Sequence, residues 1–289
     1  MNLRQTSRED RAVVERLIAQ APRSHAHLDW LDPTNLIDEE PFILASSGET
    51  AIGTLGCPPD HPDAAWVRTF AAAEGTDVEQ LWEILWAEGG SRLLDLNVEH
   101  VAALALENWF ERLVQKAGFK RTNTVIFYEL ELESGTAVGS DSGYRLRSIH
   151  STDTNTILEL DRLAFEPIWQ ISRDSLAVAI IQASSASLIE DGGEVIGYQI
   201  TTSSPFGAHL ARLAVLPSRQ REGLGTLLVN DAVQGVRETG LGQLSVNTQE
   251  NNHSSRKLYE KMGFMKTGKE FPVLEIELQS SSWRRSIFG

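Results

Sequence analysis

The sequence has few cysteine and methionine residues, no long apolar run, and fewer basic than acidic residues. Its one cysteine, Cys57, excludes an intramolecular disulfide and is typical of a small buried hydrophobic residue. No apolar run approaches the roughly 20 residues that span a bilayer, and the first residues lack the apolar stretch of a secretory signal. We therefore expect a cytoplasmic protein that makes no contact with membranes.

The acidic excess lies almost entirely in the first half. Up to Glu133 there are 23 acidic and 11 basic residues, against 17 and 15 in the remainder, and the formal net charge is −14. Because phosphate contacts need clustered lysine and arginine, this distribution argues against nucleic acid binding. An acidic first half favours solubility, and it could also attract a cationic acceptor such as an amine.

A stretch rich in glycine and serine, SGTAVGSDSG at 134–143, divides the chain and is typical of a linker. We expect a first domain at 1–135, a linker at 136–143 and a second domain at 144–289. In the second domain, hydrophobic periodicity and turn residues predict strands at 144–149, 186–190, 195–202, 209–216, 244–247 and 273–278, with helices at 152–165, after Ser172, at 224–238 and at 254–262. This order predicts an α/β (α+β) fold with a mixed sheet.

The first half repeats that order more faintly. Strands are predicted at 2–5, 42–46, 51–55 and 66–71, an apolar segment at 101–106, and helices at 8–19, 78–87 and 109–116. The segment RLVQKAGF at 112–119 matches KLYEKMGF at 257–264 in the same relative place. We therefore predict an internal duplication with a period near 145 residues.

The most informative segment is a strand that runs into a basic, glycine-containing loop and then a helix, LAVLPSRQREGLGTLL at 213–228. The first amides of a helix have no intrahelical acceptor, and the helix dipole adds partial positive charge there. Gly223 and Gly225 leave space for a phosphate to reach those amides, and Arg219 and Arg221 add positive charge. The loop lacks the lysine of a Walker loop and the third glycine of a dinucleotide fingerprint.

Gln220, Gly223 and Gly225 fill the positions of Q/R-x-x-G-x-G/A, and Asn252 opens a second segment that fits N-x5-L-Y-x3-G-F. The two motifs together resemble the GCN5-related N-acetyltransferase (GNAT) superfamily over residues 144–278. The resemblance implies two tandem acyl-coenzyme A N-acyltransferase domains, with an architecture similar to that of mycothiol synthase, and acetyl-coenzyme A as the acetyl donor.

The resemblance also implies roles for individual residues. The pyrophosphate would lie on the loop amides of Gln220, Arg221, Glu222, Gly223, Leu224, Gly225 and Thr226. The pantetheine would pair with the strand Leu213, Ala214 and Val215, and a main-chain N–H of Leu213 or Val215 would polarise the thioester carbonyl. Asn252 matches a position that contacts the cofactor, although it could equally cap the following helix. Tyr259 matches the general acid that protonates the departing thiolate.

The acceptor and the general base are not evident from the residues. The strand before the second motif, LSVNTQ at 244–249, carries no carboxylate. Glu166 is a weak candidate for the base, and Trp169 could line an acceptor pocket. We expect a small-molecule or peptide amine as acceptor, the small molecule being slightly favoured by the acidic first half.

The first half departs from the motif where chemistry would require it. Its loop AAEGTD at 72–77 has one glycine and two carboxylates, and Val114 replaces the tyrosine. We expect it to have lost catalysis and cofactor binding; it could brace the second half, cover the acceptor cleft or mediate a homodimer. His25, His27, Asp29 and Trp30 form a polar and aromatic cluster that could approach an acceptor; its default interpretation is an ordinary loop, and no metal site is expected.

A non-catalytic acyl-coenzyme A-binding regulatory or scaffold protein is the alternative function. The intact Gly223, Gly225 and Tyr259 argue against it.

Overall fold

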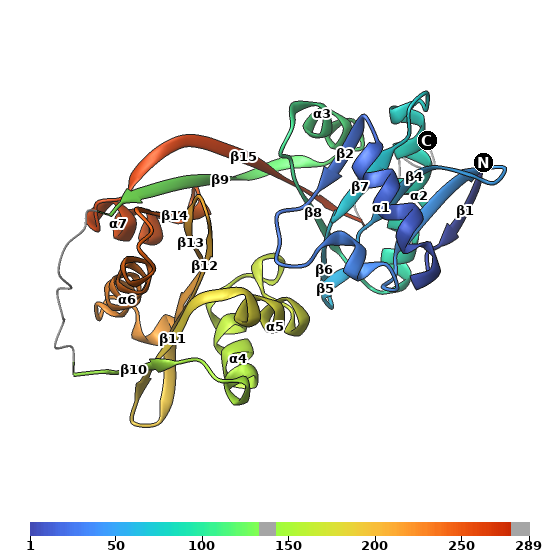
Figure 1. Ribbon diagram of the computed structural model, residues 1–289. Helices are drawn as coiled ribbons and strands as arrows, with labels where there is room; N and C mark the ends of the chain where they lie inside the picture. Colours follow the sequence, from blue (N-terminus) through green and yellow to red (C-terminus); the bar gives the residue numbers. More distant parts are fainter. Residues whose placement is uncertain (133–142, 279–289) are drawn as a thin grey trace. The chain divides into compact units, whose positions relative to one another are not determined.

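The computed structural model describes residues 1–132 and 143–278, and these form two compact units. Unit 1 comprises residues 1–123 and the chain from 271 onward, and unit 2 comprises residues 124–270. The sequence boundary at 136–143 differs from this division, and residues 136–142 lie outside the described part of the chain. The difference arises because the last strand of each half completes the sheet of the other unit (Figure 1).

Two long strands produce this exchange. Strand β9 (Lys120–Glu131) ends the first half, and its residues Val125 to Glu131 pair antiparallel with β14 (Gln243–Gln249) of unit 2. Strand β15 (Met265–Glu277) ends the second half, and its residues Val273 to Glu277 pair antiparallel with β8 (His100–Leu104) of unit 1. Neither half therefore closes its sheet with its own final strand alone.

Unit 1 contains a five-stranded antiparallel sheet in the order β1-β3-β4-β7-β2. Its elements are β1 (Asn2–Gln5), α1 (Arg11–Gln20), β2 (Arg23–Ala26), β3 (Phe42–Ser47), β4 (Thr50–Gly56), β5 (Pro59–His61), β6 (Ala64–Trp66), β7 (Thr69–Ala72), α2 (Val78–Asp95), β8 and α3 (Asn108–Lys116). The predicted strand at 66–71 is broken, because the N–H of Val67 bonds to the carbonyl of Ala102 in β8 whereas that of Arg68 bonds to Gly56 in β4. The predicted helix 78–87 continues to Asp95.

Aromatic residues of α2 fill the core of unit 1. Trp82 and Trp86 are 1% and 2% exposed and stack with their ring centroids 5.8 Å apart. Phe70 of β7 meets the edge of Trp82 at 5.2 Å, and Phe110 of α3 meets it at 5.9 Å. Burial of these large apolar surfaces stabilises the packing of α2 and α3 on the sheet. The fold of unit 1 is thus maintained without the cofactor motif.

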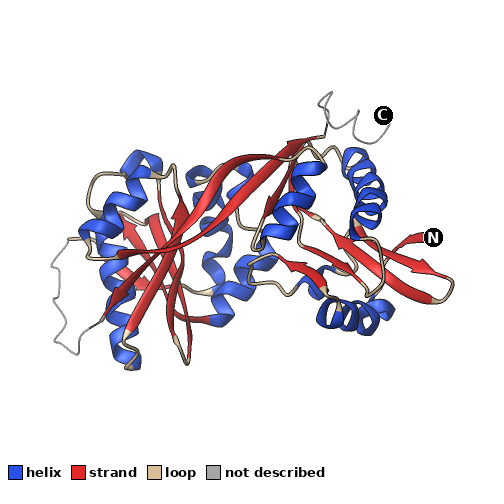
Figure 2. Cartoon of the chain, turned by 90° about the horizontal axis from the view of Figure 1, so that it is seen from above, coloured by secondary structure: helices blue, strands red, loops and turns tan. Residues whose placement is uncertain are grey.

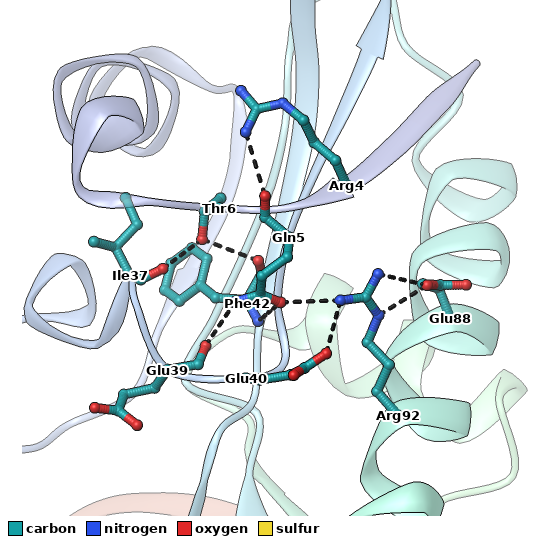
Figure 3. Close-up of polar contacts among 9 residues, drawn as sticks. All are labelled: Arg4, Gln5, Thr6, Ile37, Glu39, Glu40, Phe42, Glu88 and Arg92. Carbon is teal, nitrogen blue, oxygen red and sulfur yellow. Dashed lines mark hydrogen bonds and ion pairs between the residues drawn. The ribbon is translucent and has the colours of Figure 1, made fainter.

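A polar network ties α2 to the edge strand β1 (Figure 3). The guanidinium of Arg92 donates to the carboxylates of Glu88 and Glu40 and to the side-chain oxygen of Gln5. The amide nitrogen of Gln5 in turn donates to the carbonyl of Glu39 at 3.0 Å. The helix thus fixes both β1 and the segment that precedes β3.

Unit 2 is a mixed sheet in which β10 to β13 are antiparallel neighbours and β13 runs parallel to β14. Its elements are β10 (Arg145–Ser148), α4 (Thr154–Ala164), α5 (Arg173–Gln182), β11 (Ala183–Asp191), β12 (Glu194–Ser204), β13 (Gly207–Val215), α6 (Leu224–Thr239), β14 and α7 (His253–Lys261). This confirms the predicted fold class, and Figure 2 shows the strands (red) lying among helices (blue).

Helices α4 and α6 cover opposite faces of this sheet. A Cβ on Gly197 of β12 would lie 3.3 Å from Leu228 of α6, whereas the hydroxyl of the next residue, Tyr198, donates to Asp161 of α4. Successive residues of a strand point to opposite faces. In the described residues, none of the helices is long and apolar enough to cross a membrane.

Buried histidine makes unit 1 sensitive to acid. His25 is 3% exposed, its ring stacks on Phe110 at 3.8 Å, and burial lowers its pKa to about 4. An unfolded histidine takes up a proton near pH 6.5, whereas the folded one does so only near pH 4, so the free energy of unfolding falls as the pH drops between these values. We expect the free energy of unfolding to be lower by about 2 kcal/mol at pH 5.0 than at pH 7.5 because of His25. Urea unfolding at the two pH values measures this difference.

The control for this prediction is the exposed His100 of the same unit. His25→Gln is expected to reduce the pH dependence of unit 1, to which the buried His27 also contributes because burial lowers its pKa, and His100→Gln to leave it unchanged. Equal unfolding midpoints for the unsubstituted protein at pH 7.5 and 5.0 would contradict the prediction.

Candidate active site

Strand β13 separates from its parallel neighbour halfway along its length. It pairs with β14 only from Ala208 to Leu210, and the register with β12 shifts so that Ala211 is an extra, bulged residue. Beyond this bulge, no strand of the described chain pairs with the edge of β13 that faces away from β12. The bulge thus opens a gap between two strands of one sheet.

The main chain of β13 presents hydrogen-bonding groups to this gap. The N–H of Leu216 bonds to the carbonyl of Ile196 in β12, and bonding residues alternate along an antiparallel pair. Arg212 and Ala214 therefore direct their main-chain groups to β12, whereas Leu213 and Val215 direct theirs to the open edge. Of the three strand residues implicated by sequence, Leu213 and Val215 have the available N–H and C=O groups.

The loop after β13 places free amides at the start of α6. Gly223 is the N-cap residue, with φ of 85°, and Arg221 also has a positive φ, of 69°. No side chain of the described residues caps this helix end, so the first-turn amides of Leu224, Gly225 and Thr226 have no acceptor within the helix. A Cβ at Gly223 would have no atom within 4 Å, so the space in front of the loop is open.

Ion pairs hold this loop in shape. The guanidinium of Arg219 donates to Glu222 at 3.1 Å and to Asp191 at 2.8 Å, and the hydroxyl of Tyr144 donates to Glu222. Arg219, beside the exposed Glu222, lowers the pKa of that carboxyl. Gln220 bonds weakly to the carbonyl of Val215 at 3.5 Å. Arg219 is therefore engaged with carboxylates, which reduces the positive charge that the sequence analysis expected it to add at the loop.

Helix α7 packs closely on the first turn of α6 and lines the same gap. A Cβ at Gly225 would approach Leu258 to 3.0 Å, so glycine permits this close contact. Asn252 caps α7 by accepting from the N–H of Ser255 at 3.1 Å, as the capping alternative predicts. Its side chain also lines the cleft, so it lies where the cofactor-binding prediction needs it.

Tyr259 lies in the wall of the cleft. It is 3% exposed, its ring packs against Tyr128 and Phe264, and its hydroxyl is hydrogen-bonded to the side chain of Ser255. Burial raises the pKa of Tyr259, whereas the bond to Ser255 lowers it by less. The phenol consequently keeps its proton throughout the neutral range.

The cleft contains a buried ion pair that sequence reasoning missed. Arg212 of β13 donates two bonds to Asp161 of α4, at 2.8 and 2.6 Å, and Asp161 is 1% exposed. Tyr198 donates to the same carboxylate at 2.5 Å, and the ring of Phe165 lies 3.9 Å from the guanidinium. An aspartate on the apolar face of the predicted helix 152–165 was the signal available in the sequence.

The lining of the cleft comes wholly from unit 2. Trp169, the predicted acceptor-side residue, belongs to it, whereas the exposed Glu166 does not. In the described residues the lining includes no carboxylate and no histidine. Its residues are Val125, Phe165, Trp169, Leu210, Ala211, Arg212, Leu213, Val246, Asn247, Thr248, Gln249, Asn252, Ser255 and Tyr259.

Unit 1 has a kinked strand in the corresponding place, but its own chain fills the open edge. Strand β2 pairs antiparallel with β7, from Arg23 opposite Ala72 to Ala26 opposite Thr69, on the edge of β7 that faces away from β4. The N–H of His27 then bonds to the carbonyl of Arg68 at the kink. The polar cluster at 25–30 is thus not an ordinary loop, because it begins as the strand that occupies this edge.

A metal ion has no evident set of ligands in the part of the chain that the structure describes. No group of three or more His, Cys, Asp or Glu side chains is placed to hold one there.

Comparison with known proteins identifies the motif-bearing region. Residues 154–264 match the acetyltransferase (GNAT) family. Over 77 residues the chain is 38% identical to the [ribosomal protein bS18]-alanine N-acetyltransferase of Haemophilus influenzae, a match that covers 27% of this chain and about half, 51%, of that relative.

Solved structures resemble the chain over nearly its whole length. A GCN5-related N-acetyltransferase from Sphaerobacter thermophilus gives a TM-score of 0.61 at 15% identity over 96% of each chain. A tandem GNAT protein from the clavulanic acid biosynthesis pathway gives 0.63 at 16% identity, over 97% of this chain and 100% of that one. At these identities the likeness establishes the fold of both halves. Residues 154–264 therefore form an acetyltransferase domain of the GNAT family, in a chain with the fold of a tandem GNAT protein.

Proposed function

We propose that unit 2 is an N-acetyltransferase that moves an acetyl group from acetyl-coenzyme A to a primary amine. The observation that carries this proposal is that the open main-chain edge of β13 and the buried Tyr259 border one cleft, and that the loop after β13 leads to the free amides of α6. Acetyl-coenzyme A, when bound, supplies an activated acetyl thioester. The residues present fit such a ligand, because a peptide-like chain can pair with the edge and an anion with the amides.

Specific groups of the chain would hold the donor. The amides of residues 221–226 would bind the pyrophosphate, and the open space in front of Gly223 admits it. The main-chain groups of Leu213 and Val215 would pair with the pantetheine amides. Asn252, which also lines the cleft, would contact the donor through the part of its side chain that does not cap α7.

Two groups would act on the reacting atoms. The N–H of Leu213, next to the bulge, would donate to the acetyl carbonyl oxygen, where negative charge develops. As the amine nitrogen bonds to the acetyl carbon and the carbon–sulfur bond breaks, the hydroxyl proton of Tyr259 passes to the sulfur. The surplus proton of the amine passes to water, and water returns a proton to Tyr259.

Unit 1 would take no part in donor binding, because β2 occupies the edge that would pair with pantetheine. Its loop at 73–77 also carries Glu74 and Asp77 where phosphates would lie, and the Asp77 carboxylate already caps α2. The protein is therefore expected to bind one acetyl-coenzyme A per chain.

Product formation tests the proposed activity. The purified protein is incubated with acetyl-coenzyme A and a pool of primary amines, and both acetylated amines and free thiol are measured. An acetylated amine and free coenzyme A should appear in equal amounts. Binding of acetyl-coenzyme A without any acetylated amine would instead support the regulatory or scaffold function.

A further inference from the structure

The charge of the cleft limits the amine that unit 2 can use. Arg212 is the one charged side chain in the lining that the structure describes, and the other polar groups there are neutral amides and hydroxyls, such as Asn247, Thr248 and Gln249. A site for a cationic amine would be expected to present carboxylates to it. The positive charge of Arg212 is already paired with Asp161, and no side chain of the described lining can stabilise an ammonium or accept its proton, so the amine must reach the cleft without its proton.

The requirement for a neutral amine separates amines by pKa. At pH 7.5 about a third of an α-amino group, with a pKa near 7.7 to 8.0, is neutral, whereas only about 0.1% of a lysine side chain is. Because the described lining has no carboxylate or histidine to remove the proton, this difference of about 200-fold in reactive amine is not offset at the site. The cleft therefore favours an α-amine.

Arg212 retains hydrogen-bond donors for a ligand. Its Nε and Nη2 donate to Asp161, and Nη2 also donates to the carbonyl of Trp169 at 2.7 Å. The hydrogen bonds that Arg212 makes to described residues all leave from Nε and Nη2, none from Nη1, and the side chain is 14% exposed. Asp161 and the Phe165 ring thus fix the guanidinium while one of its nitrogens is left for an acceptor oxygen.

Unit 1 shows what such an arginine binds when the gap is filled. Arg68 is the first residue past the last bond to β8, whereas Arg212 is the second residue past the last pairing with β14. Its Nη2 bonds to Asp60, and its Nη1 bonds to Asp29, which lies three residues after β2. The segment that occupies the open edge in unit 1 therefore also delivers an oxygen to the arginine at the kink.

We propose that Arg212 Nη1 donates to a carbonyl or carboxylate oxygen next to the reacting amine, so that the acceptor is an α-amino acid derivative or a peptide N-terminus. This inference rests on the proposed acetyl transfer. An α-amine carries such an oxygen on the adjacent carbon, and a lysine side chain or a simple alkylamine does not. Arg212 is then the residue that determines acceptor specificity.

The test compares matched amines as acceptors. Alaninamide carries the α-amine and its neighbouring oxygen, ethylamine is the same amine without the carboxamide, and Nα-acetyllysine amide offers only a side-chain amine. We expect kcat/KM at pH 7.5 to be about 100-fold or more higher for alaninamide than for the lysine derivative. At equal concentrations of neutral amine, alaninamide should exceed ethylamine about tenfold, and trialanine amide shows whether a peptide or an amino acid is preferred.

Variants of the arginine separate recognition from folding. Arg212→Lys keeps the charge opposite Asp161 and removes the guanidinium fork, so the preference for alaninamide over ethylamine should fall to about one with unchanged acetyl-coenzyme A affinity. Arg212→Lys should also bind alaninamide more weakly, which ligand-observed NMR measures. Arg147→Lys is the matched control, since Arg147 pairs with Asp153 in the same unit and does not line the cleft. If Arg212→Lys does not fold, the double variant Arg212→Gln and Asp161→Asn removes both buried charges together.

Each result decides the inference. Equal or faster acetylation of the lysine derivative, or equal use of ethylamine at the same neutral concentration, would overturn it and leave the N-acetyltransferase proposal standing. Binding of acetyl-coenzyme A without acetylation of any of these amines would overturn both. A preference for alaninamide that survives in Arg212→Lys would remove Arg212 from the recognition of the acceptor.

Discussion

Gly223→Asp is expected to reduce acetyl-coenzyme A binding from one site per chain to none. Gly223 adopts φ of 85° at the N-cap of α6, and the space in front of it is open. An aspartate there places a negative charge where the pyrophosphate would bind, and like charges in this position repel. We expect affinity to fall about 100-fold or more, corresponding to about 2.7 kcal/mol, in a calorimetric titration.

Gly240→Asp is the matched control. Gly240 ends the same helix with φ of 78° and equally open surroundings, so the substitution brings the same charge and the same backbone strain to the opposite end of α6. It should leave one site per chain intact. Two sites in the unsubstituted protein would contradict the idea that β2 closes unit 1, and loss of binding in Gly240→Asp would show that helix strain, rather than the charge at the loop, is responsible.

Tyr259→Phe is expected to lower turnover about 100-fold or more without weakening acetyl-coenzyme A binding. Proton donation by a positioned side chain contributes about 10² to 10⁴ in rate, and phenylalanine retains the ring that packs against Tyr128 and Phe264. Because burial keeps the tyrosine protonated, the rate should not fall through its ionisation between pH 6 and 9. Steady-state kinetics with saturating donor, beside a calorimetric Kd, measure both quantities.

Tyr128→Phe provides the comparison for that variant. Tyr128 is 1% exposed, and its ring centroid lies 6.2 Å from that of Tyr259, but its hydroxyl donates to Glu260 instead of bonding to Ser255. Tyr128→Phe should lower the free energy of unfolding by about 1 kcal/mol and leave turnover nearly unchanged. Similar losses of turnover in the two variants would indicate that Tyr259 serves packing alone.

The donor-binding half of the site could be predicted because it is local in sequence. Strand, loop and helix start lie within residues 213–226, and a run of residues with the right turn chemistry must place its own amides. Asn252 and Tyr259 were found in the same way, since they share one helix and its cap. The helix cap at Ser172 and the hairpin between β11 and β12 are of the same kind, and the structure contains both.

Features that depend on distant partners could not be predicted. Arg68 and Arg212 both lie close to the kink of their strand, but only the chain's path after β2 decides that Asp29 reaches one of them and no carboxylate of the described lining reaches Nη1 of the other. The sequence predicts one continuous strand at 66–71, and only the different neighbours of its two parts, β8 and β4, divide it.

The sequence by itself determined that residues 213–264 carry the two motifs that resemble the GNAT family, and that the first half shares the fold without these motifs. The tertiary structure alone decided how the first half closes its open edge with β2, which final strand completes which sheet, and which charge lines the acceptor cleft. The physical reason is the range of the interactions: helix-end amides and turn glycines act within a few residues, whereas strand pairing and buried ion pairs join residues about 40 to 180 positions apart.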